Sequence, residues 1–471
     1  MIEGIDKLLP ANEIADFRAA LAQFSDRCVR LRVDREFAEI PFPTQPVPWF
    51  DGGYWITDPE VRPGGGLPFA ASDFYIQDAA SLLPLRLLDV QTDDRICDLC
   101  ASPGGKASAI AERLGPDGYL VANETIRSRI DVLRHNLART GRANYATCSF
   151  DPDLLQLRCS DLFVKVLVDV PCSGQTLVGL GKQDASAFRA QHIEHCARRA
   201  RRILAAAARM LAPNGMLVLA TCTFSIEENE AQVAWLQETF PNAFQPVELD
   251  GLAPWKSSIA RGCYRLWPHR DRCRGGFAAA LRKTGEIPPL PKEHDAGLWR
   301  NGRSRRARND PLGKESQKEF ASWLNQLGTW PIGYRIAEKM ATVAEPGIRK
   351  LLEQKEAEDG FQPALAATVA GRHWEPTHAL ALASPRWFVP NSEVHLSDPQ
   401  ALAFMAGQSL PRGDSAARGP GGEFVAGWVR AKWCGKPIGW LKASGNRWNN
   451  HLPAWARLAI NASTTDRQPS E

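Results

Sequence analysis

Two cysteines follow apolar segments of the chain, at positions where a thiol could act as a nucleophile. Cys172 stands in the segment DVPCSG (169–174) and Cys222 in the segment TCT (221–223), each directly after an apolar run. A single cysteine in such a place is more often a small buried hydrophobic residue than a reactive one. Two of them, with Asp169 beside one, indicate thiolate chemistry in which sulfur adds to an electrophilic carbon.

A glycine-rich segment, CASPGGK (100–106), follows the apolar run 95–100 and precedes a helical pattern. Glycines let the backbone approach a ligand, and the first N–H groups of a helix are free to bind it. A Walker loop would need Gly at 100 and Ser or Thr at 107, where this chain has Cys and Ala, and G-x-G-x-x-G is absent. A nucleotide-like ligand of another kind is therefore predicted, with a purely structural turn as the alternative. The candidate binding residues are Cys100, Ala101, Ser102, Pro103, Gly104, Gly105 and Lys106.

Acidic residues end three successive predicted strands. Glu124 follows the second strand, 20 residues after Gly104, where a carboxylate commonly accepts hydrogen bonds from ribose hydroxyls. Asp151 and Asp169 end the third and fourth strands. Single acids at such positions are usually turn formers or helix caps, but three in register with a glycine-rich turn predict one shared ligand crevice.

Cys97 and Cys100 form a C-x-x-C pair, which could indicate zinc or redox chemistry. No second C-x-x-C or histidine cluster completes a zinc site in the sequence. Residues three apart on a strand also face opposite sides of a sheet. We therefore expect no metal site here.

From about residue 95, short apolar runs alternate with helical patterns, which is typical of a parallel sheet covered by helices. Ser225 and Glu228 have the spacing of a capping box, which predicts a helix start. The segments 264–270 and 275–283 are typical of a closing antiparallel pair. A doubly wound α/β sheet follows from this pattern. Its predicted strands are 95–100, 118–124, 146–151, 164–170 and 216–221, and its longest predicted helix is 188–211.

The flanking segments differ from this pattern. A helix is predicted near 14–24, followed by a proline-rich stretch, and residues 312–354 contain helical patterns. Residues 361–460 are rich in Trp, with short possible strands. The expected division is an N-terminal accessory region (1–75), a sheet domain (76–284), a basic linker (285–311) and a C-terminal region with a small β-rich module (312–471).

The net charge of +4 is too small to identify a nucleic-acid-binding protein by itself. Two basic clusters could follow a phosphate backbone, although a solvated surface or linker is as good an interpretation of each. One cluster comprises Arg300, Arg303, Arg305, Arg306 and Arg308. The other comprises Arg261, Arg265, His269, Arg270, Arg272 and Arg274.

The first residues, MIEGIDKLLPANEIADF, carry acids early and no uninterrupted apolar core, so they do not resemble a signal peptide. No run of about 18 apolar residues indicates a membrane span. We expect a cytoplasmic protein whose 11 cysteines are reduced.

Five segments in a fixed order carry a resemblance to a known family. DLCASPGGK, VANE, VDVPCSG, ATCTFSIEENE and GGFAAALRK resemble the successive motifs of Nop/Sun RNA cytosine-5 methyltransferases, over about residues 70–284. The C-terminal region is similar to that of RsmF-type ribosomal RNA methyltransferases. The resemblance implies a seven-stranded class I methyltransferase domain, with S-adenosylmethionine as the cofactor.

The same resemblance assigns roles to residues. It implies that Cys222 is the nucleophile that adds to carbon 6 of cytosine, because carbon 5 is itself a poor nucleophile and needs this covalent activation. Cys172 would help to resolve the adduct, and Asp169 would hydrogen-bond the base. Residues 100–106, Glu124, Asp151 and Asp169 would contact the cofactor. After VPCSG, where many relatives have Glu-Gly and later Arg and Asp-Pro, this chain has QTLVGLGKQ (175–183), which leaves substrate choice open.

The end of the chain, from Gly427, resembles the PUA-like tail of RsmF-type enzymes. Lys436, Lys442 and Arg447 alternate there with aromatic residues, as an RNA-binding surface requires. The equally weighted alternative is that the aromatic rings fill the core of a small β module. The residues concerned are Trp428, Trp433, Trp440, Trp448 and Trp455.

We expect an RNA (cytosine-5)-methyltransferase that acts on structured, most plausibly ribosomal, RNA. Transfer RNA is the nearest alternative substrate. An RNA-binding ribosome-assembly factor without catalysis is a second alternative, against which the intact Cys172, Cys222 and Asp169 argue. A DNA-acting enzyme is disfavoured by the T-C motif and the RNA-type tail.

Overall fold

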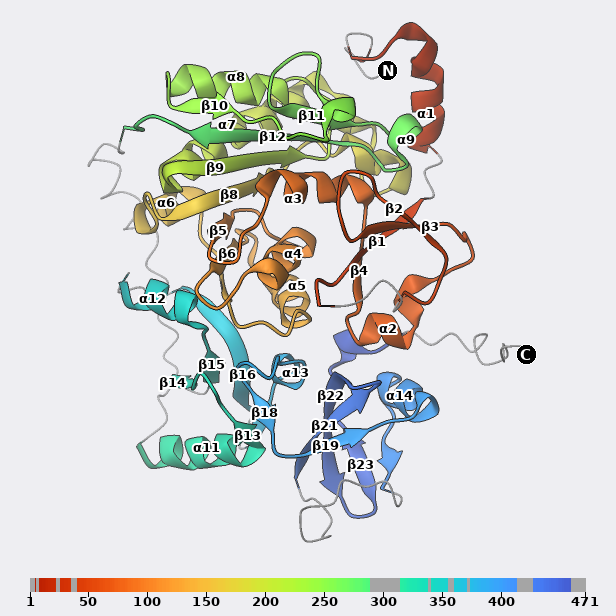
Figure 1. The fold of residues 1–471 in the computed structure, drawn as a ribbon, viewed down its shortest axis with the longest axis vertical. Coiled ribbons are helices and arrows are strands. Elements are labelled where there is room, and N and C mark those ends of the chain that lie inside the picture. The colour runs from red at the N-terminus through yellow and green to blue at the C-terminus, as the bar shows by residue number, and fades with distance from the viewer. Residues whose placement is uncertain are drawn as a thin grey trace.

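The computed structural model describes most of the 471-residue chain (Figure 1). The described residues are 5, 8–22, 26–34, 40–288, 314–337, 340–354, 360–370, 373–412 and 427–458. Most of the predicted linker 285–311 lies outside them, and so does the whole arginine cluster at 300–308.

A mixed sheet forms the centre of the molecule, with the strand order β10-β12-β9-β8-β5-β6-β7 continuing through β16-β15-β14. Strands β5 to β9 run parallel, whereas β12 runs antiparallel to β9, β10 and β11. The predicted Rossmann-like, seven-stranded fold class is confirmed. The core strands are β5 Arg95–Asp98, β6 Tyr119–Asn123, β7 Tyr145–Cys148, β8 Phe163–Asp169, β9 Leu211–Thr221, β10 Phe244–Pro246, β11 Cys263–Leu266 and β12 Gly276–Lys283.

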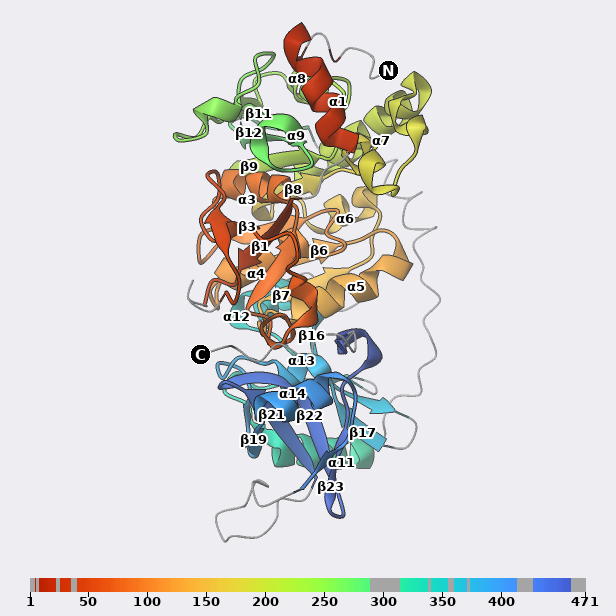
Figure 2. The ribbon, with the colours of Figure 1, turned by 90° about the vertical axis from the view of Figure 1, so that its right-hand side faces the viewer.

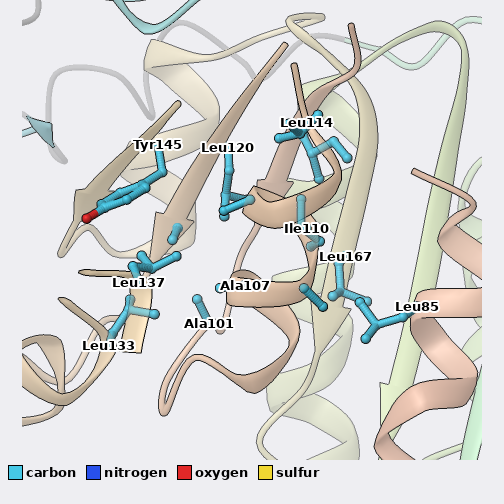
Figure 3. Close-up of a cluster of buried hydrophobic side chains, with 14 of the residues drawn as sticks. Leu85, Ala101, Ala107, Ile110, Leu114, Leu120, Leu133, Leu137, Tyr145 and Leu167 are labelled. Atoms are coloured by element: carbon cyan, nitrogen blue, oxygen red, sulfur yellow. The ribbon is translucent and has the colours of Figure 1, made fainter. Parts of the chain in front are cut away.

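Alternate residues of these strands face two hydrophobic layers. Ile96 and Leu120 pack with α3, α4 and α5, whereas their neighbours Cys97 and Val121 pack with α6, α7 and α8. The first layer, which underlies the glycine-rich turn at Ala101, is drawn in Figure 3. The helices are α3 Leu83–Leu88, α4 Gly105–Arg113, α5 Arg127–Ala138, α6 Pro152–Arg158, α7 Ala190–Met210, α8 Glu230–Thr239 and α9 Pro268–Asp271.

The N-terminal region forms the predicted helix, α1 Ile14–Ala22, and then a four-stranded antiparallel sheet that the sequence analysis did not predict. The strands are too short for a clear alternation of polar and apolar residues. Their order is β2-β3-β1-β4, and α3 connects β4 to the first strand of the central sheet. The elements are β1 Arg27–Leu31, β2 Thr44–Pro46, β3 Gly53–Ile56, α2 Leu67–Ala70 and β4 Phe74–Gln77.

The C-terminal region begins by extending the central sheet, because β16 pairs antiparallel with β7. A second, five-stranded sheet of order β19-β21-β22-β23-β20 then lies at the opposite end of the long axis from α1 (Figures 1 and 2). The strands are β13 Gly328–Thr329, β14 Arg335–Ala337, β15 Met340–Val343, β16 Gln362–Ala370, β17 His373–Pro376, β18 Val389–Pro390, β19 Glu393–His395, β20 Leu410–Pro411, β21 Trp428–Trp433, β22 Lys436–Ser444 and β23 Arg447–Asn450. The helices are α11 Lys314–Leu327, α12 Pro346–Gln354, α13 His378–Ala381 and α14 Asp398–Met405.

Two local predictions differ from the structure. Strand β9 begins at Leu211 rather than 216, because the residues between the predicted helix and strand pair with β8 through an irregularity in register. Helix α8 begins at Glu230, after the expected start at Ser225. The Glu228 carboxylate does not complete a capping box, since it binds Ser173 instead.

The basic stretch 261–274 mostly joins parts of the fold. Arg265 is buried and its guanidinium pairs with Glu230. Arg270 and His269 contact Glu13. Arg272 pairs with Asp26 and Arg274 with Asp78. The contacts with Glu13 and Asp26 tie the N-terminal region to the sheet domain. Among the described contacts, only the exposed Arg261 of this cluster has no carboxylate partner.

The C-terminal tryptophans differ in how deeply they are buried. Trp440 and Trp448 are 2% exposed and belong to the hydrophobic core. Trp428 and Trp433 are half-buried. Trp455 is 43% exposed, and its ring stacks on His135 of α5 with centroids 3.9 Å apart. For Trp440 and Trp448, therefore, the core interpretation holds.

Within the part of the chain that is described, no helix is both long enough and apolar enough to cross a bilayer.

Candidate functional site

The glycine-rich turn lies where β5 ends and α4 begins, beside a cavity of about 240 Å³. The Ala101 amide donates to the Asn123 carbonyl at 2.8 Å, which fixes the turn to β6. Gly104 has a φ of +114°, a conformation that L side chains rarely adopt, and a Cβ there would lie 3.0 Å from Cβ of Asn136. The cavity is lined by Tyr75, Ile76, Gln77, Asp78, Ser81, Asp98, Cys100, Ala101, Ser102, Pro103, Gly105, Lys106 and Asp169.

Asp98 is a residue of this cavity that the sequence analysis did not single out. Its side chain is 1% exposed, and neither carboxylate oxygen has a hydrogen-bond partner among the described residues. Burial raises the pKa of Asp98 to about 7; the charge of Lys106 lowers it and that of Asp169 raises it further. A buried carboxylate without hydrogen bonds is costly for the fold, which favours a role toward a ligand.

Lys106 and Asp169, both predicted site residues, form an ion pair with Nζ and Oδ2 2.6 Å apart. The Lys106 side chain is 16% exposed, so it is not the solvated lysine of an ordinary helix start. Burial disfavours its charge, but Asp169 outweighs that effect and the pKa of Lys106 is raised; Asp98 and Cys222 contribute smaller increases. The lysine thus places a positive charge between the cavity and the cysteines.

The other two predicted acids do not line the cavity. Glu124 is 5% exposed, and its Oε1 accepts a hydrogen bond from the Ile126 amide at 2.9 Å. Asp151 caps α6 and binds Arg202 of α7 in a bidentate ion pair. Of the three acids, only Asp169 lines the cavity.

The two cysteines lie side by side at the ends of β8 and β9. Their Sγ atoms are 3.0 Å apart, and the Cys222 amide also donates to Sγ of Cys172 at 3.3 Å. The hydrogen bond to Cys222, together with burial, raises the pKa of Cys172 well above its usual range. Cys172 therefore keeps its proton at neutral pH and can donate it to the neighbouring sulfur.

A buried carboxylate holds both cysteine loops. Glu228 is 1% exposed and accepts hydrogen bonds from the Ser173 amide at 2.8 Å and the Ser173 hydroxyl at 2.6 Å. The Thr223 hydroxyl is 3.3 Å from the same carboxylate and 3.0 Å from the Ser173 hydroxyl. Burial raises the pKa of Glu228, and these donors oppose that rise. Because Ser173 and Thr223 each follow a cysteine, Glu228 fixes the relative position of the two thiols.

Strand β4 of the N-terminal region also lines the cavity, and the sequence analysis missed this contribution. Gln77 has both side-chain amide atoms buried without a hydrogen-bond partner in the described chain. A Cβ on Gly105 would lie 3.2 Å from Oε1 of Gln77, so the glycine is what permits this approach. The polar pair Gln77-Asp78 at the end of an aromatic run was the available signal.

Cys97 and Cys100 lie in different surroundings. Cys97 packs in the layer below the sheet, whereas Cys100 lines the cavity. Among the described residues, no group of three or more His, Cys, Asp or Glu side chains is placed to hold a metal ion.

Comparison with known proteins identifies the family. The family model described as "16S rRNA methyltransferase RsmB/F" matches residues 85–282, and that described as "Methyltransferase RsmF PUA domain" matches residues 391–458. Ribosomal RNA small subunit methyltransferase F from Escherichia coli O17:K52:H18 is 30% identical over 431 residues, which cover 87% of this chain and 84% of that protein. The chain belongs to the RsmF family.

A second RsmF relative matches over a shorter length. Ribosomal RNA small subunit methyltransferase F from Citrobacter koseri is 38% identical over 256 residues, which span 52% of this chain and 53% of that protein. A solved structure, a methyltransferase homolog protein from Pyrococcus horikoshii, is 25% identical with a TM-score of 0.50, and covers 58% of this chain and 92% of that one. RsmF proteins are thus RNA methyltransferases of the Sun/Nop type on a class I fold, a class that uses S-adenosylmethionine.

Proposed function

We propose that this RsmF family member methylates carbon 5 of a cytosine in ribosomal RNA, through a covalent adduct between Cys222 and carbon 6 of the base. The observation that carries the proposal is the pair of thiols 3.0 Å apart at the strand ends next to the Lys106–Asp169 ion pair. A protein that only binds RNA has no need of two thiols in this arrangement.

The cavity at the glycine-rich turn fits S-adenosylmethionine. Its wall offers buried polar groups without partners, Asp98 and Gln77, which suit the cationic amino group and the carboxylate of an amino acid. The residues that would hold the cofactor are 100–106 together with Asp98. Glu124 would accept hydrogen bonds from the ribose hydroxyls. Asp151 would lie further along the same cofactor-binding edge. S-adenosylmethionine supplies an electrophilic methyl group for carbon 5.

In this proposal Cys222 is the nucleophile. Its thiolate forms a carbon–sulfur bond at carbon 6, and the electron pair of the carbon 5–carbon 6 double bond moves toward carbon 5. The Lys106 ammonium lies close enough for its charge to interact with the Cys222 side chain. Cys172, which retains its proton, stabilises that thiolate by donating a hydrogen bond to it.

Asp169 and Cys172 complete the cycle. Lys106 binds Oδ2 of Asp169, which leaves Oδ1 for the base edge at N3 and N4 and for the charge that develops there. After methylation a base removes the proton from carbon 5, the double bond re-forms and the Cys222 thiolate leaves. Cys172, next to the departing sulfur, assists this resolution.

The proposal extends to the remaining parts of the chain. Residues 76–284 would form the methyltransferase domain and 312–471 the RNA-binding region, with 1–75 as an accessory region and 285–311 as a linker. Ribosomal RNA is preferred over transfer RNA because the family model that matches residues 85–282 and the relative from Escherichia coli are both named for ribosomal RNA methyltransferases. Because this substrate is cytoplasmic, we expect the enzyme in the cytoplasm.

The test is incubation of the purified protein with labelled S-adenosylmethionine and one nucleic acid at a time. We expect label in small-subunit ribosomal RNA, with little in transfer RNA or DNA. Bisulfite sequencing of the labelled RNA should then locate one protected cytosine. Absence of label from every RNA would refute the proposed enzymatic activity. Labelled RNA in which bisulfite sequencing finds no protected cytosine would refute methylation at carbon 5.

A further inference from the structure

A second polar cavity lies where three parts of the chain meet, apart from the site described above. Its volume is about 200 Å³. The N-terminal region contributes the residues around Arg32 and Ser72, helix α5 contributes Arg139 at its C-terminal end, and the C-terminal region contributes the β21–β22 hairpin. The lining residues are Arg32, Asp34, Ala71, Ser72, Arg139, Leu382, Ala383, Ser384, Pro385, Arg430, Lys432, Gly435, Lys436 and Pro437.

Positive charge is concentrated around this cavity. Among the described lining residues are five cationic side chains and a single acid, Asp34. Asp73 and Glu393 stand behind the lining and form ion pairs with Lys436 and with Arg430 and Lys432. Five cations against three carboxylates leave an excess of two positive charges around the cavity.

Arg139 carries the clearest part of this excess. Its guanidinium donates to the Phe69 carbonyl at 2.6 Å and lies over the Phe69 ring, and it forms no ion pair within the described chain. Burial, with the nearby charge of Arg32, lowers the pKa of Arg139 to about 10. The charge of Glu112 offsets this effect only in part, so burial of the Arg139 guanidinium has a cost that an anion in the cavity would reduce.

Ser72 gives a second, independent indication. The residue lines the cavity and is 6% exposed, and its hydroxyl has no hydrogen-bond partner among the described residues. Buried hydroxyls are normally satisfied. A ligand with acceptor oxygens would satisfy it.

We propose that this cavity binds a phosphate group of the RNA backbone and so anchors the substrate at the junction of the three regions. The inference rests on the proposed function, since it takes RNA as the ligand. Arginine and lysine together with a hydroxyl are the groups that commonly bind phosphate oxygens in nucleic-acid complexes.

Two elements connect the cavity with the cofactor site. Ser72 lies just before β4, and the strand ends at Gln77 in the wall of the cofactor cavity, a span of at most about 17 Å for an extended chain. Arg139 follows α5 one turn after Asn136, which packs on the glycine-rich turn. An RNA strand anchored here would keep a nucleotide several residues away within reach of the cysteines.

The test uses two variants of the full-length protein and a matched control. Lys432→Gln removes one lining charge while Glu393 keeps its pair with Arg430, and Ser384→Asp adds a negative charge to the wall. Lys350→Gln removes an exposed charge outside the cavity. S-adenosylmethionine affinity and thermal unfolding establish that each variant is folded.

We expect both cavity variants to bind transcribed small-subunit ribosomal RNA about 5- to 10-fold more weakly, and the control to stay within about twofold. The slope of log affinity against log salt should become shallower by about 0.7 to 0.9 for Lys432→Gln, as for one lost phosphate contact. Inorganic phosphate alone should compete only at high concentration.

Three outcomes would overturn the proposal. RNA affinity and salt slope could be unchanged in folded cavity variants while the wild type still binds and methylates RNA, which would leave the proposed function intact. The control could lose as much affinity as the variants, which would indicate a general charge effect. Inorganic phosphate could compete as strongly as RNA, which would indicate a small-anion site. Failure of the wild type itself to bind RNA would instead refute the proposed function.

Discussion

The two cysteine loops and the cofactor cavity are neighbours at one edge of the sheet. Each contains a buried carboxylate, but the two carboxylates differ in their hydrogen bonding. Glu228, beneath the cysteines, accepts hydrogen bonds from the Ser173 amide and hydroxyl and from the Thr223 hydroxyl. Asp98, equally buried at 1% exposure, has no hydrogen-bond partner among the described residues. Burial raises the pKa of both groups.

The difference separates a part of the site whose polar groups bind one another from a part whose polar groups are available to a ligand. A satisfied network fixes two loops before any substrate arrives, which is what positioning of a nucleophile requires. An unsatisfied group weakens the free protein but strengthens binding of a ligand that satisfies it. The following experiments test that contrast.

The largest effect should come from the nucleophile on the pre-organised side. Cys222→Ala should abolish both methyl transfer and the covalent protein–RNA adduct, because the neighbouring Cys172 keeps its proton and does not replace the lost thiolate. Cys172→Ala should still form the adduct but release it slowly, so that a covalent complex accumulates on a denaturing gel.

The reverse pattern is loss of the adduct in Cys172→Ala and its retention in Cys222→Ala. That result would assign the nucleophilic role to Cys172. Full activity of Cys222→Ala would rule out the covalent mechanism. Wild-type affinity for S-adenosylmethionine in both variants is the control for folding.

On the cofactor side, Glu124→Ala tests the acid predicted to hold the ribose. Loss of a charge-assisted hydrogen bond to a buried group costs about 1.5 to 3 kcal/mol, which corresponds to roughly 10- to 150-fold weaker cofactor binding. Calorimetry with S-adenosylmethionine measures this directly. Asp131→Ala, which removes an exposed acid on α5, is the matched control. Equal cofactor affinities of the two variants would show that Glu124 does not bind the cofactor.

The sequence predicted the parts of the site that lie on long, regular elements. The strands ending at Asp169 and Cys222 are apolar throughout, and the turn at Gly104 has a distinctive composition, so their common edge followed from the α/β pattern alone. Three acids at strand ends were expected to converge in the same way. Only Asp169 does so, because Asp151 is taken up by Arg202.

What the sequence could not supply depends on contacts between distant segments. Gln77 comes from a four-residue strand that has no detectable periodicity, and it meets the glycine-rich turn only in the folded chain. Glu228 was assigned to a helix cap from its spacing to Ser225, whereas its partner Ser173 lies 55 residues earlier. Local patterns identify capping candidates, but tertiary contacts decide which partner a carboxylate takes.

Glu228→Gln tests whether the hydrogen-bonded network positions the thiols. The amide retains one acceptor but presents an N–H group to the hydroxyls, so the loops should shift while the fold persists. We expect adduct formation to slow by about 10- to 100-fold, since small misplacements of reacting groups have effects of that size. S-adenosylmethionine affinity should not change. The neighbouring Glu227→Gln should behave as wild type, and a full-rate Glu228→Gln would show that the network is dispensable.

The smallest effect concerns Asp98, and it is visible through pH. Burial raises the pKa of Asp98 from 3.8 to about 7, so the folded protein holds a proton that the unfolded chain releases. Between about pH 4 and 7 the free energy of unfolding therefore falls as pH rises, by no more than about 4 kcal/mol in total. Asp98→Asn lacks this dependence. Urea unfolding at pH 5 and pH 8 should show the variant gaining stability relative to wild type at the higher pH.

Cofactor binding should show the opposite dependence at the same residue. The ionised carboxylate of Asp98 attracts the cationic amino group of S-adenosylmethionine, and the ionised fraction increases about tenfold from pH 6 to pH 8 for a pKa near 7. Wild-type affinity should therefore rise by up to roughly tenfold over this range, whereas that of Asp98→Asn should stay nearly flat. Calorimetry in buffers of equal ionic strength measures both. An equal rise in the affinity of Asp98→Asn would mean that another group titrates. Asp98 would then have a structural role and would not bind the cofactor.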